Sequence, residues 1–158
     1  MADKPEISGL SDLVVEELRL LRKFVAALTG EQALLVAGDI DRLSPILAEK
    51  SRLAAGLGEY ASRRNQALAS AGLEGDQAGM EVWLAGQDQA TRSAWDEILG
   101  LAREARRENE INGNLIKTRM QHNQQALSVL QAASKQALLY GPDGQQRPAD
   151  GGRDFGVA

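Results

Sequence analysis

The first regular pattern of apolar residues runs from Leu10 to about Ala37. Its apolar positions recur at alternating spacings of four and three, and only Gln32 interrupts them. This spacing is typical of a helix that packs along a coiled-coil seam. Ser11 or Asp12 could cap the start of the helix. The seam positions are Val14, Leu18, Leu21, Val25, Leu28 and Leu35.

A second apolar pattern follows the break at Gly38 and Asp39 and continues over residues 43–68. Ser44 and Pro45 suit the first turn of a helix, where the missing N–H of proline does no harm, so the helix could begin near Ser44. The short connection predicts that the first two helices lie antiparallel as a hairpin. The expected apolar stripe of the second helix is Leu43, Leu47, Ala54, Leu57, Ala61 and Leu68.

Residues 71–89 contain four glycines, and the helical periodicity fades there. We interpret this segment as a connection with one short helix around residues 80–85. Trp83 lies in the connection and Trp95 follows it. Because a large aromatic ring contributes much apolar area, we expect at least one of the two indoles to pack over the end of the hairpin.

The third pattern runs from about Thr91 to Leu139 and predicts the longest helix, about 70 Å at about 1.5 Å per residue. Its middle is unusual because several polar residues fall on or beside the apolar seam. Polar layers in a seam either fix the register of a bundle or mark a stretch that binds something else. These polar residues are Asn109, Asn112, Arg119, His122 and Asn123.

These patterns predict an all-α fold: an elongated antiparallel helical hairpin plus a long third helix, with coiled-coil-like packing. The apolar residues are mostly Leu and Ala, which suits helices better than strands. Residues 1–140 are expected to form a single helical domain. From Gly141 onward Gly and Pro are frequent and periodicity is lost, so residues 141–158 are predicted to be a disordered, flexible tail.

Composition narrows the possible functions. The net charge is −4, and the basic residues are not clustered, which argues against nucleic-acid binding. The chain has no cysteine, so disulfides and thiolate chemistry are excluded. The N-terminus resembles no secretory signal, and no apolar run approaches the ~20 residues of a membrane span. A cytoplasmic protein without a membrane span is expected.

The sequence offers no set of catalytic residues. His122 is the sole histidine, so neither a Ser-His-Asp relay elsewhere nor a di-iron site with two Glu-x-x-His pairs can form. No glycine-rich phosphate loop is present. Glu104, Glu108 and Glu110 alternate with arginines along one helix, as expected for intrahelical ion pairs. We therefore predict a binding protein with no catalytic activity, no cofactor and no metal site.

Three motifs of the third helix and its exit carry a family resemblance. They are Asn-Gly-Asn-Leu-Ile at 112–116, Asn-Gln-Gln-Ala-Leu-Ser-Val-Leu at 123–130 and Leu-Tyr-Gly-Pro-Asp-Gly-Gln at 139–145. In that order and spacing they resemble the FlgN family of flagellar export chaperones. Pro142 departs from the family pattern and should only stiffen the turn.

The resemblance implies a cytosolic chaperone that binds the C-terminal helices of the hook-filament junction proteins FlgK and FlgL. It would prevent their premature assembly and deliver them to the export gate. The tyrosine of the third motif, Tyr140, is implicated in docking to the gate. Asparagines at 112 and 123 would hydrogen-bond along the seam beside a visiting helix. The predicted partner-binding residues are Asn112, Leu115, Ile116, Asn123, Leu127, Val129, Leu130 and Tyr140.

Two alternatives stay open on the sequence. Residues 112–130 could be the third member of a closed bundle with no room for a guest. The chain could also be a structural coiled-coil homo-oligomer or adaptor without chaperone activity, whose third helix pairs with itself. A dimer that persists in the presence of the cargo peptide would favour the second alternative.

Overall fold

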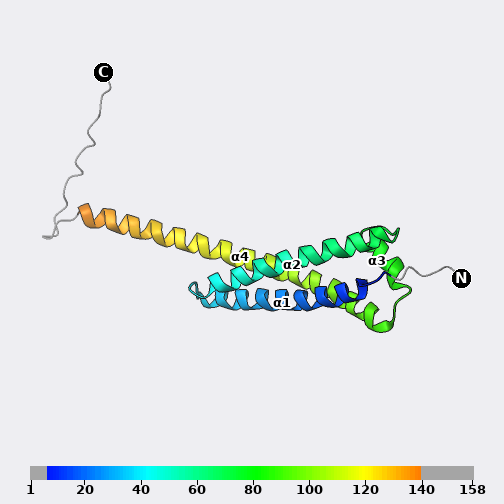
Figure 1. The fold of residues 1–158 in the computed structure, drawn as a ribbon. Coiled ribbons are helices and arrows are strands. Elements are labelled where there is room, and N and C mark those ends of the chain that lie inside the picture. The colour runs from blue at the N-terminus through cyan, green and yellow to red at the C-terminus, as the bar shows by residue number, and fades with distance from the viewer. Residues whose placement is uncertain (1–6, 140–158) are drawn as a thin grey trace, which may run out of the picture. The chain divides into compact units, whose positions relative to one another are not determined.

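The computed structural model of the chain describes residues 7–139, with side chains described to residue 135. It contains four helices, and residues 7–139 include no strand: α1 (Leu10–Ala37), α2 (Leu43–Ser70), α3 (Gln77–Leu84) and α4 (Gln89–Leu139) (Figure 1). The predicted all-α class is confirmed. The chain divides into two compact units, residues 1–116 and 117–158. The predicted tail lies outside the described residues, and the predicted division at residue 140 stays a prediction.

The antiparallel hairpin of α1 and α2 is confirmed (Figure 1). A glycine ends α1 because the turn requires a left-handed backbone: Gly38 has φ 74°, and the N–H of Asp39 donates to the carbonyl of Leu34 at 3.0 Å. The prediction of Ser11 or Asp12 as the N-terminal cap is wrong. Gly9 occupies that position with φ 82°, and no side chain caps the helix.

The face of α2 that packs against α1 differs from the predicted stripe. Leu47, predicted to be inside, is 40% exposed, whereas Leu53, predicted to lie beside the stripe, is 4% exposed. The inward face follows spacings of three and four through positions 46, 50, 53, 57, 60, 64 and 68, all of which are buried or partly buried. Two of these positions hold the charged residues Lys50 and Arg64. Because the sequence prediction followed apolar residues only, it selected some positions on a neighbouring face of the helix.

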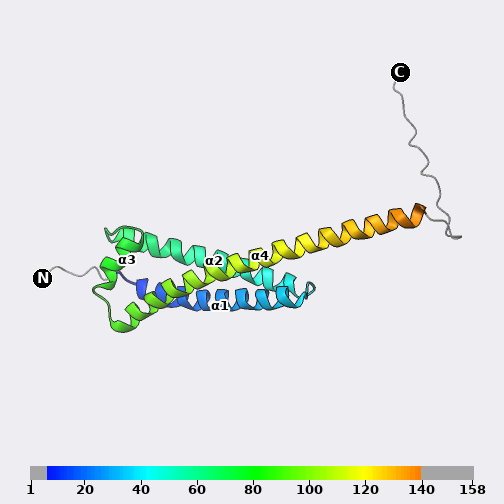
Figure 2. The same ribbon diagram turned by 180° about the vertical axis from the view of Figure 1, so that it is seen from behind.

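The short helix α3 covers the end of the bundle where α1 begins and α2 ends (Figures 1 and 2). It begins where predicted within a few residues, and Asp76 caps it by accepting a hydrogen bond from the N–H of Gly79 at 3.1 Å. Both Trp83 and Trp95 are buried in the core, which confirms the prediction for the indoles. The core at this end also contains Leu10, Val14, Leu68, Met80, Leu84 and Ile98.

Helix α4 begins at Gln89, two residues before the predicted start, because Asp88 caps it. The carboxylate of Asp88 accepts a hydrogen bond from the backbone N–H of Thr91 at 2.8 Å. This hydrogen bond lowers the pKa of Asp88 below its usual value. Further along, Glu97 of α4 pairs with Arg22 of α1 through two hydrogen bonds of 2.8 and 2.7 Å, which lower the pKa of Glu97. Both carboxylates therefore stabilise the fold in their ionised form.

A pH dependence follows from these two lowered pKa values. Their contribution to the free energy of unfolding is complete above the ordinary carboxyl pKa of about 4. It is lost as the pH falls through the lower pKa that each group has in the folded protein. Asn caps a helix as well as Asp but does not titrate. In Asp88→Asn, urea unfolding followed by circular dichroism should therefore show a smaller loss of stability between pH 7 and pH 3 than in the wild type. An unchanged loss would contradict the assignment to Asp88.

Candidate protein-binding site

Two polar layers cross the interior of the unit formed by residues 1–116. In the first layer, the carboxylate of Glu17 on α1 accepts hydrogen bonds from the guanidinium of Arg64 on α2. The same guanidinium stacks over the ring of Trp95 on α4, 4.8 Å from the ring centroid. Glu17 is buried, and the Arg64 side chain is only 13% exposed. This layer thus joins all three long helices.

The second polar layer joins the same three helices farther along the bundle. The carboxylate of Glu31 on α1 accepts a hydrogen bond from Lys50 Nζ on α2 at 3.1 Å and one from Asn112 Nδ2 on α4 at 3.0 Å. Asn112 also donates to the carbonyl of Leu28 at 2.9 Å. Glu31 and Asn112 are each 1% exposed. The side chain of Asn112 is therefore committed to the interior of the bundle.

The two layers fix the register of the hairpin. Glu17 and Glu31 are two heptads apart on α1, and Lys50 and Arg64 are two heptads apart on α2. A slip of one heptad in either direction would place Leu57 opposite one of the buried carboxylates. Burying an unpaired carboxylate is costly, so slipped hairpins are disfavoured. Sequence reasoning anticipated a register role for polar residues on the third helix, but it missed their partners on the first two.

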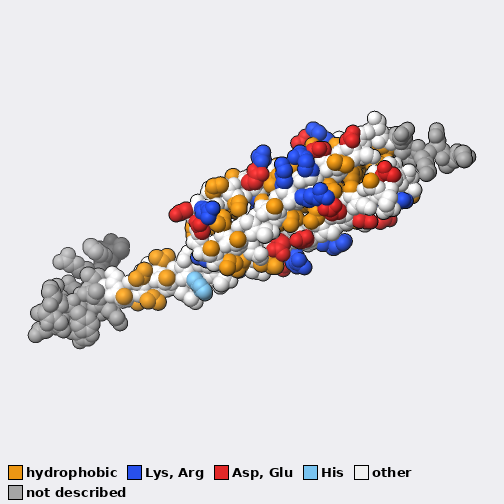
Figure 3. Space-filling view, turned by 90° about the horizontal axis from the view of Figure 1, so that it is seen from below, with side chains coloured by type: hydrophobic (Ala, Val, Ile, Leu, Met, Phe, Trp, Pro, Cys, Tyr) orange, Lys and Arg blue, Asp and Glu red, His pale blue; other side chains and the backbone are white. Residues whose placement is uncertain are grey.

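The unit that begins at Lys117 carries an exposed apolar stripe. We define the exposed stripe as Met120, Asn123, Leu127 and Leu130, which follow one another at spacings of three, four and three and so share one face of α4. The three apolar side chains are 59%, 57% and 65% exposed, respectively. Figure 3 shows hydrophobic side chains gathered on this segment between the histidine, His122, and the residues drawn in grey. Sequence reasoning missed Met120, although the spacing from Ile116 could have revealed it.

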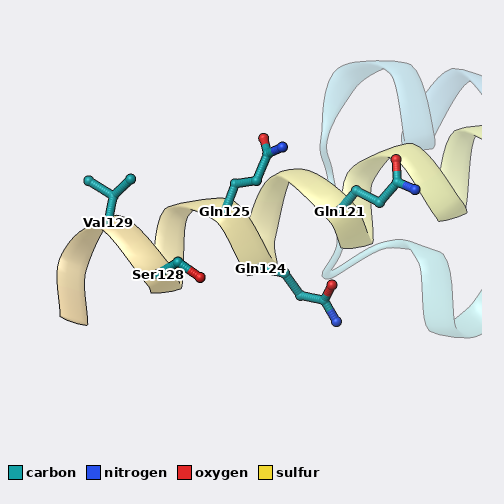
Figure 4. Close-up of a pocket in the computed structure, with 5 residues that line it drawn as sticks. All are labelled: Gln121, Gln124, Gln125, Ser128 and Val129. Carbon is teal, nitrogen blue, oxygen red and sulfur yellow. The ribbon is translucent and has the colours of Figure 1, made fainter. Parts of the chain in front are cut away.

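The opposite side of this helical segment is mainly polar. Val129 is 67% exposed but lies about 160° around the helix from Leu127, at about 100° per residue. It lines a shallow hollow with Gln121, Gln124, Gln125 and Ser128 (Figure 4). These five residues all come from α4. Amides and one hydroxyl on an open surface suit hydrogen bonds to a partner or to water.

The predicted partner-binding residues lie in both units of the chain and beyond the described residues. Leu115 is half-buried and Ile116 is 37% exposed. Both lie at the C-terminal end of the first unit. Leu127, Val129, Leu130 and Asn123 are exposed in the second unit. Tyr140 lies outside the described residues. Because Asn112 lies in the interior, we leave it out of the proposed binding surface. The contact of any of these residues with a partner stays a prediction.

Within residues 7–139 we find no group of three or more acidic, His or Cys side chains that could hold a metal ion. In that same range, no helix has the length and apolar character needed to cross a membrane. The candidate site is the exposed stripe of α4, bordered by polar side chains.

The model of the FlgN protein family matches residues 1–148 of the chain. The chain belongs to the FlgN family. It is 30% identical over 145 residues to the flagella synthesis protein FlgN of Yersinia enterocolitica. The matched region covers 90% of this chain and 92% of that protein. The FlgN of Proteus mirabilis is 30% identical over 144 residues, covering 89% and 92%. No solved structure gives a significant match. The resemblance noted on three C-terminal motifs therefore extends over nearly the whole chain, and it places the protein in flagellar synthesis.

Proposed function

We propose that this protein is a non-catalytic, cytoplasmic chaperone of flagellar type III export. In this proposal the exposed stripe binds the C-terminal helices of the hook-filament junction proteins, FlgK and FlgL. Binding keeps these proteins from assembling early and allows their delivery to the export gate, where Tyr140 docks. The observation that carries the proposal is a row of apolar side chains, each more than half exposed, in a chain of the FlgN family.

The physical argument concerns the apolar surface of both partners. Subunits that polymerise through amphipathic helices expose the apolar stripe of those helices before assembly. A partner helix with its own exposed stripe can cover them in the helix-in-groove mode. Full burial of a Leu or Met side chain contributes about 1.5–3 kcal/mol. Three such side chains contribute about 4.5–9 kcal/mol before the cost of association, so we expect a complex of modest affinity.

The amide-rich surroundings of the stripe support a reversible complex. Asn123 lies within the exposed stripe, between Met120 and Leu127, and would be costly to bury without a hydrogen-bond partner. Side chains or backbone groups of a cargo helix can satisfy it. Permanent complexes have larger and more apolar interfaces. A partner that binds a stripe containing a polar residue can therefore dissociate more readily. Reversibility is what delivery to an export gate requires.

Isothermal titration of the full-length protein with a synthetic C-terminal helix of a junction protein tests the proposal. We expect a one-to-one complex with a dissociation constant tighter than about 100 μM. Sedimentation velocity at low micromolar protein should show any self-association giving way to the complex. A dimer that the peptide does not disturb, together with no heat of binding, would reject the chaperone role in favour of a structural homo-oligomer.

A further inference from the structure

The charges of the chain are distributed unevenly along α4. Between residues 89 and 110, acidic and basic side chains are interspersed. After Glu110 the next acidic residue is Asp143, and the intervening segment contains Lys117, Arg119 and Lys135. A net charge of +3 thus falls on the segment with the exposed stripe, in a chain whose net charge is −4. The net charge of this segment is therefore opposite in sign to the net charge of the whole chain.

The three basic residues border the exposed stripe. At about 100° per residue, Lys117 and Lys135 fall on the same edge of the stripe, and Arg119 falls on the other edge. Lys117 and Lys135 are both exposed. They are 18 residues apart, which corresponds to about 27 Å along the helix. A helix lying along the stripe would therefore meet positive charge along the edge that holds Lys117 and Lys135, and no acidic residue lies between Glu110 and Asp143.

We propose that the natural partner of the exposed stripe is an acidic amphipathic helix of about 18 residues, with Asp or Glu at the positions that flank its apolar face. This inference rests on the proposed function, because it specifies the partner of the same surface. Flanking charges of opposite sign speed association and suppress wrong pairings, as they do in coiled coils. The same charges discourage two copies of this segment from pairing with each other in parallel or antiparallel register.

A protein partner fits better than an anionic membrane. Helices that lie in a lipid headgroup region carry many Lys and Arg residues on their polar face and anchor with Trp or Phe. Residues 117–135 have three basic residues, no aromatic residue, and a polar face made mainly of Gln and Ser. Amides recognise a hydrogen-bonding protein surface and gain little from an anionic lipid. An acidic helix is the occupant that the basic residues beside the exposed stripe favour.

The test uses three designed 18-residue peptides with the same leucine stripe and with Glu, Gln or Lys at the flanking positions. Each is titrated into the full-length protein at low and high salt. We expect the Glu peptide to bind about tenfold more tightly than the Lys peptide at ~20 mM salt, and the ratio to shrink to about threefold or less at ~500 mM. Equal affinities at low salt would overturn the inference.

Charge reversal localises the effect. The Lys117→Glu/Lys135→Glu variant should prefer the Lys peptide. A matched variant, Lys23→Glu/Arg103→Glu, changes the net charge equally at exposed positions of the other unit and should keep the wild-type preference. Equal changes in both variants would overturn the inference by assigning the effect to net charge. Co-sedimentation of the protein with vesicles of equal parts phosphatidylglycerol and phosphatidylcholine, without binding of the Glu peptide, would also overturn it.

Failure of the proposed function is distinguishable in the same assay. If the Glu peptide binds with the expected salt dependence but no junction-protein helix binds, the charge inference stands and the chaperone role for those cargoes falls. If the junction-protein helix binds while the designed peptides show no charge preference, the chaperone role stands and the charge inference is overturned.

Discussion

Lys50→Met is expected to destabilise the protein by about 3 kcal/mol. The substitution keeps an unbranched apolar side chain but removes the ammonium group that pairs with Glu31 at 3.1 Å. The Glu31 side chain is 1% exposed, so the carboxylate would be left with the hydrogen bond from Asn112 as its remaining described contact. Removing one partner of a buried pair leaves an uncompensated buried charge. Urea unfolding followed by circular dichroism measures the change.

The double variant Glu31→Leu/Lys50→Met is the control for this prediction. It removes both charges and fills the space with apolar atoms, so most of the lost stability should return. Asn112 can still donate to the carbonyl of Leu28 in this variant. If Lys50→Met were as stable as the wild type, the carboxylate of Glu31 would not depend on Lys50, and the role of this layer in fixing the register would have to be given up.

Leu127→Asp is expected to weaken binding of the junction-protein helix by about 100-fold or more. The change removes an apolar side chain from the centre of the exposed stripe and places a charge where the partner would bury it, a loss of about 3 kcal/mol. Leu127 is 57% exposed, so the fold of the unbound protein should be nearly unchanged. Titration calorimetry measures the affinity, and far-ultraviolet circular dichroism measures the helical content.

Val129→Asp provides a matched comparison on the same helix. The two positions are two residues apart and similarly exposed, and the introduced residue is identical, so the intrinsic cost to the helix is nearly equal. Because Val129 lies on the opposite side of the helix from the exposed stripe, its substitution should change the affinity by about threefold or less. Equal loss of binding in both variants would contradict a one-sided interface, and unfolding of Leu127→Asp would place Leu127 in a core.

Much of the architecture was predictable because helical periodicity is a local property of the sequence. The spacing of Leu and Val along residues 10–37 requires a helix whatever it packs against, and Gly38 supplies the left-handed turn that closes the hairpin. The glycine-rich connection and the short helix before α4 were also visible. The caps were less predictable: Ser11 offers a suitable side chain, yet Gly9 ends the preceding segment with φ 82°.

The candidate site was predictable only in part. The motifs at 112–116 and 123–130 pointed to the correct helix, but no sequence motif states whether a polar residue on a seam is buried or exposed. Asn112 and Asn123 lie on the same seam, 11 residues apart. Asn112 is enclosed because Leu28 and Glu31 of α1 lie beside it, whereas Asn123 is exposed.

The sequence by itself determined the all-α class, the hairpin, the course of the long last helix and, through its motifs, the family. Only the tertiary structure decided which face of α2 packs against α1. Lys50 and Arg64 lie on that face because they donate hydrogen bonds to Glu31 and Glu17 of α1. The tertiary structure also decided which apolar residues of α4 remain exposed. Periodicity shows that a helix has an apolar face, but burial depends on which distant segments come to cover that face.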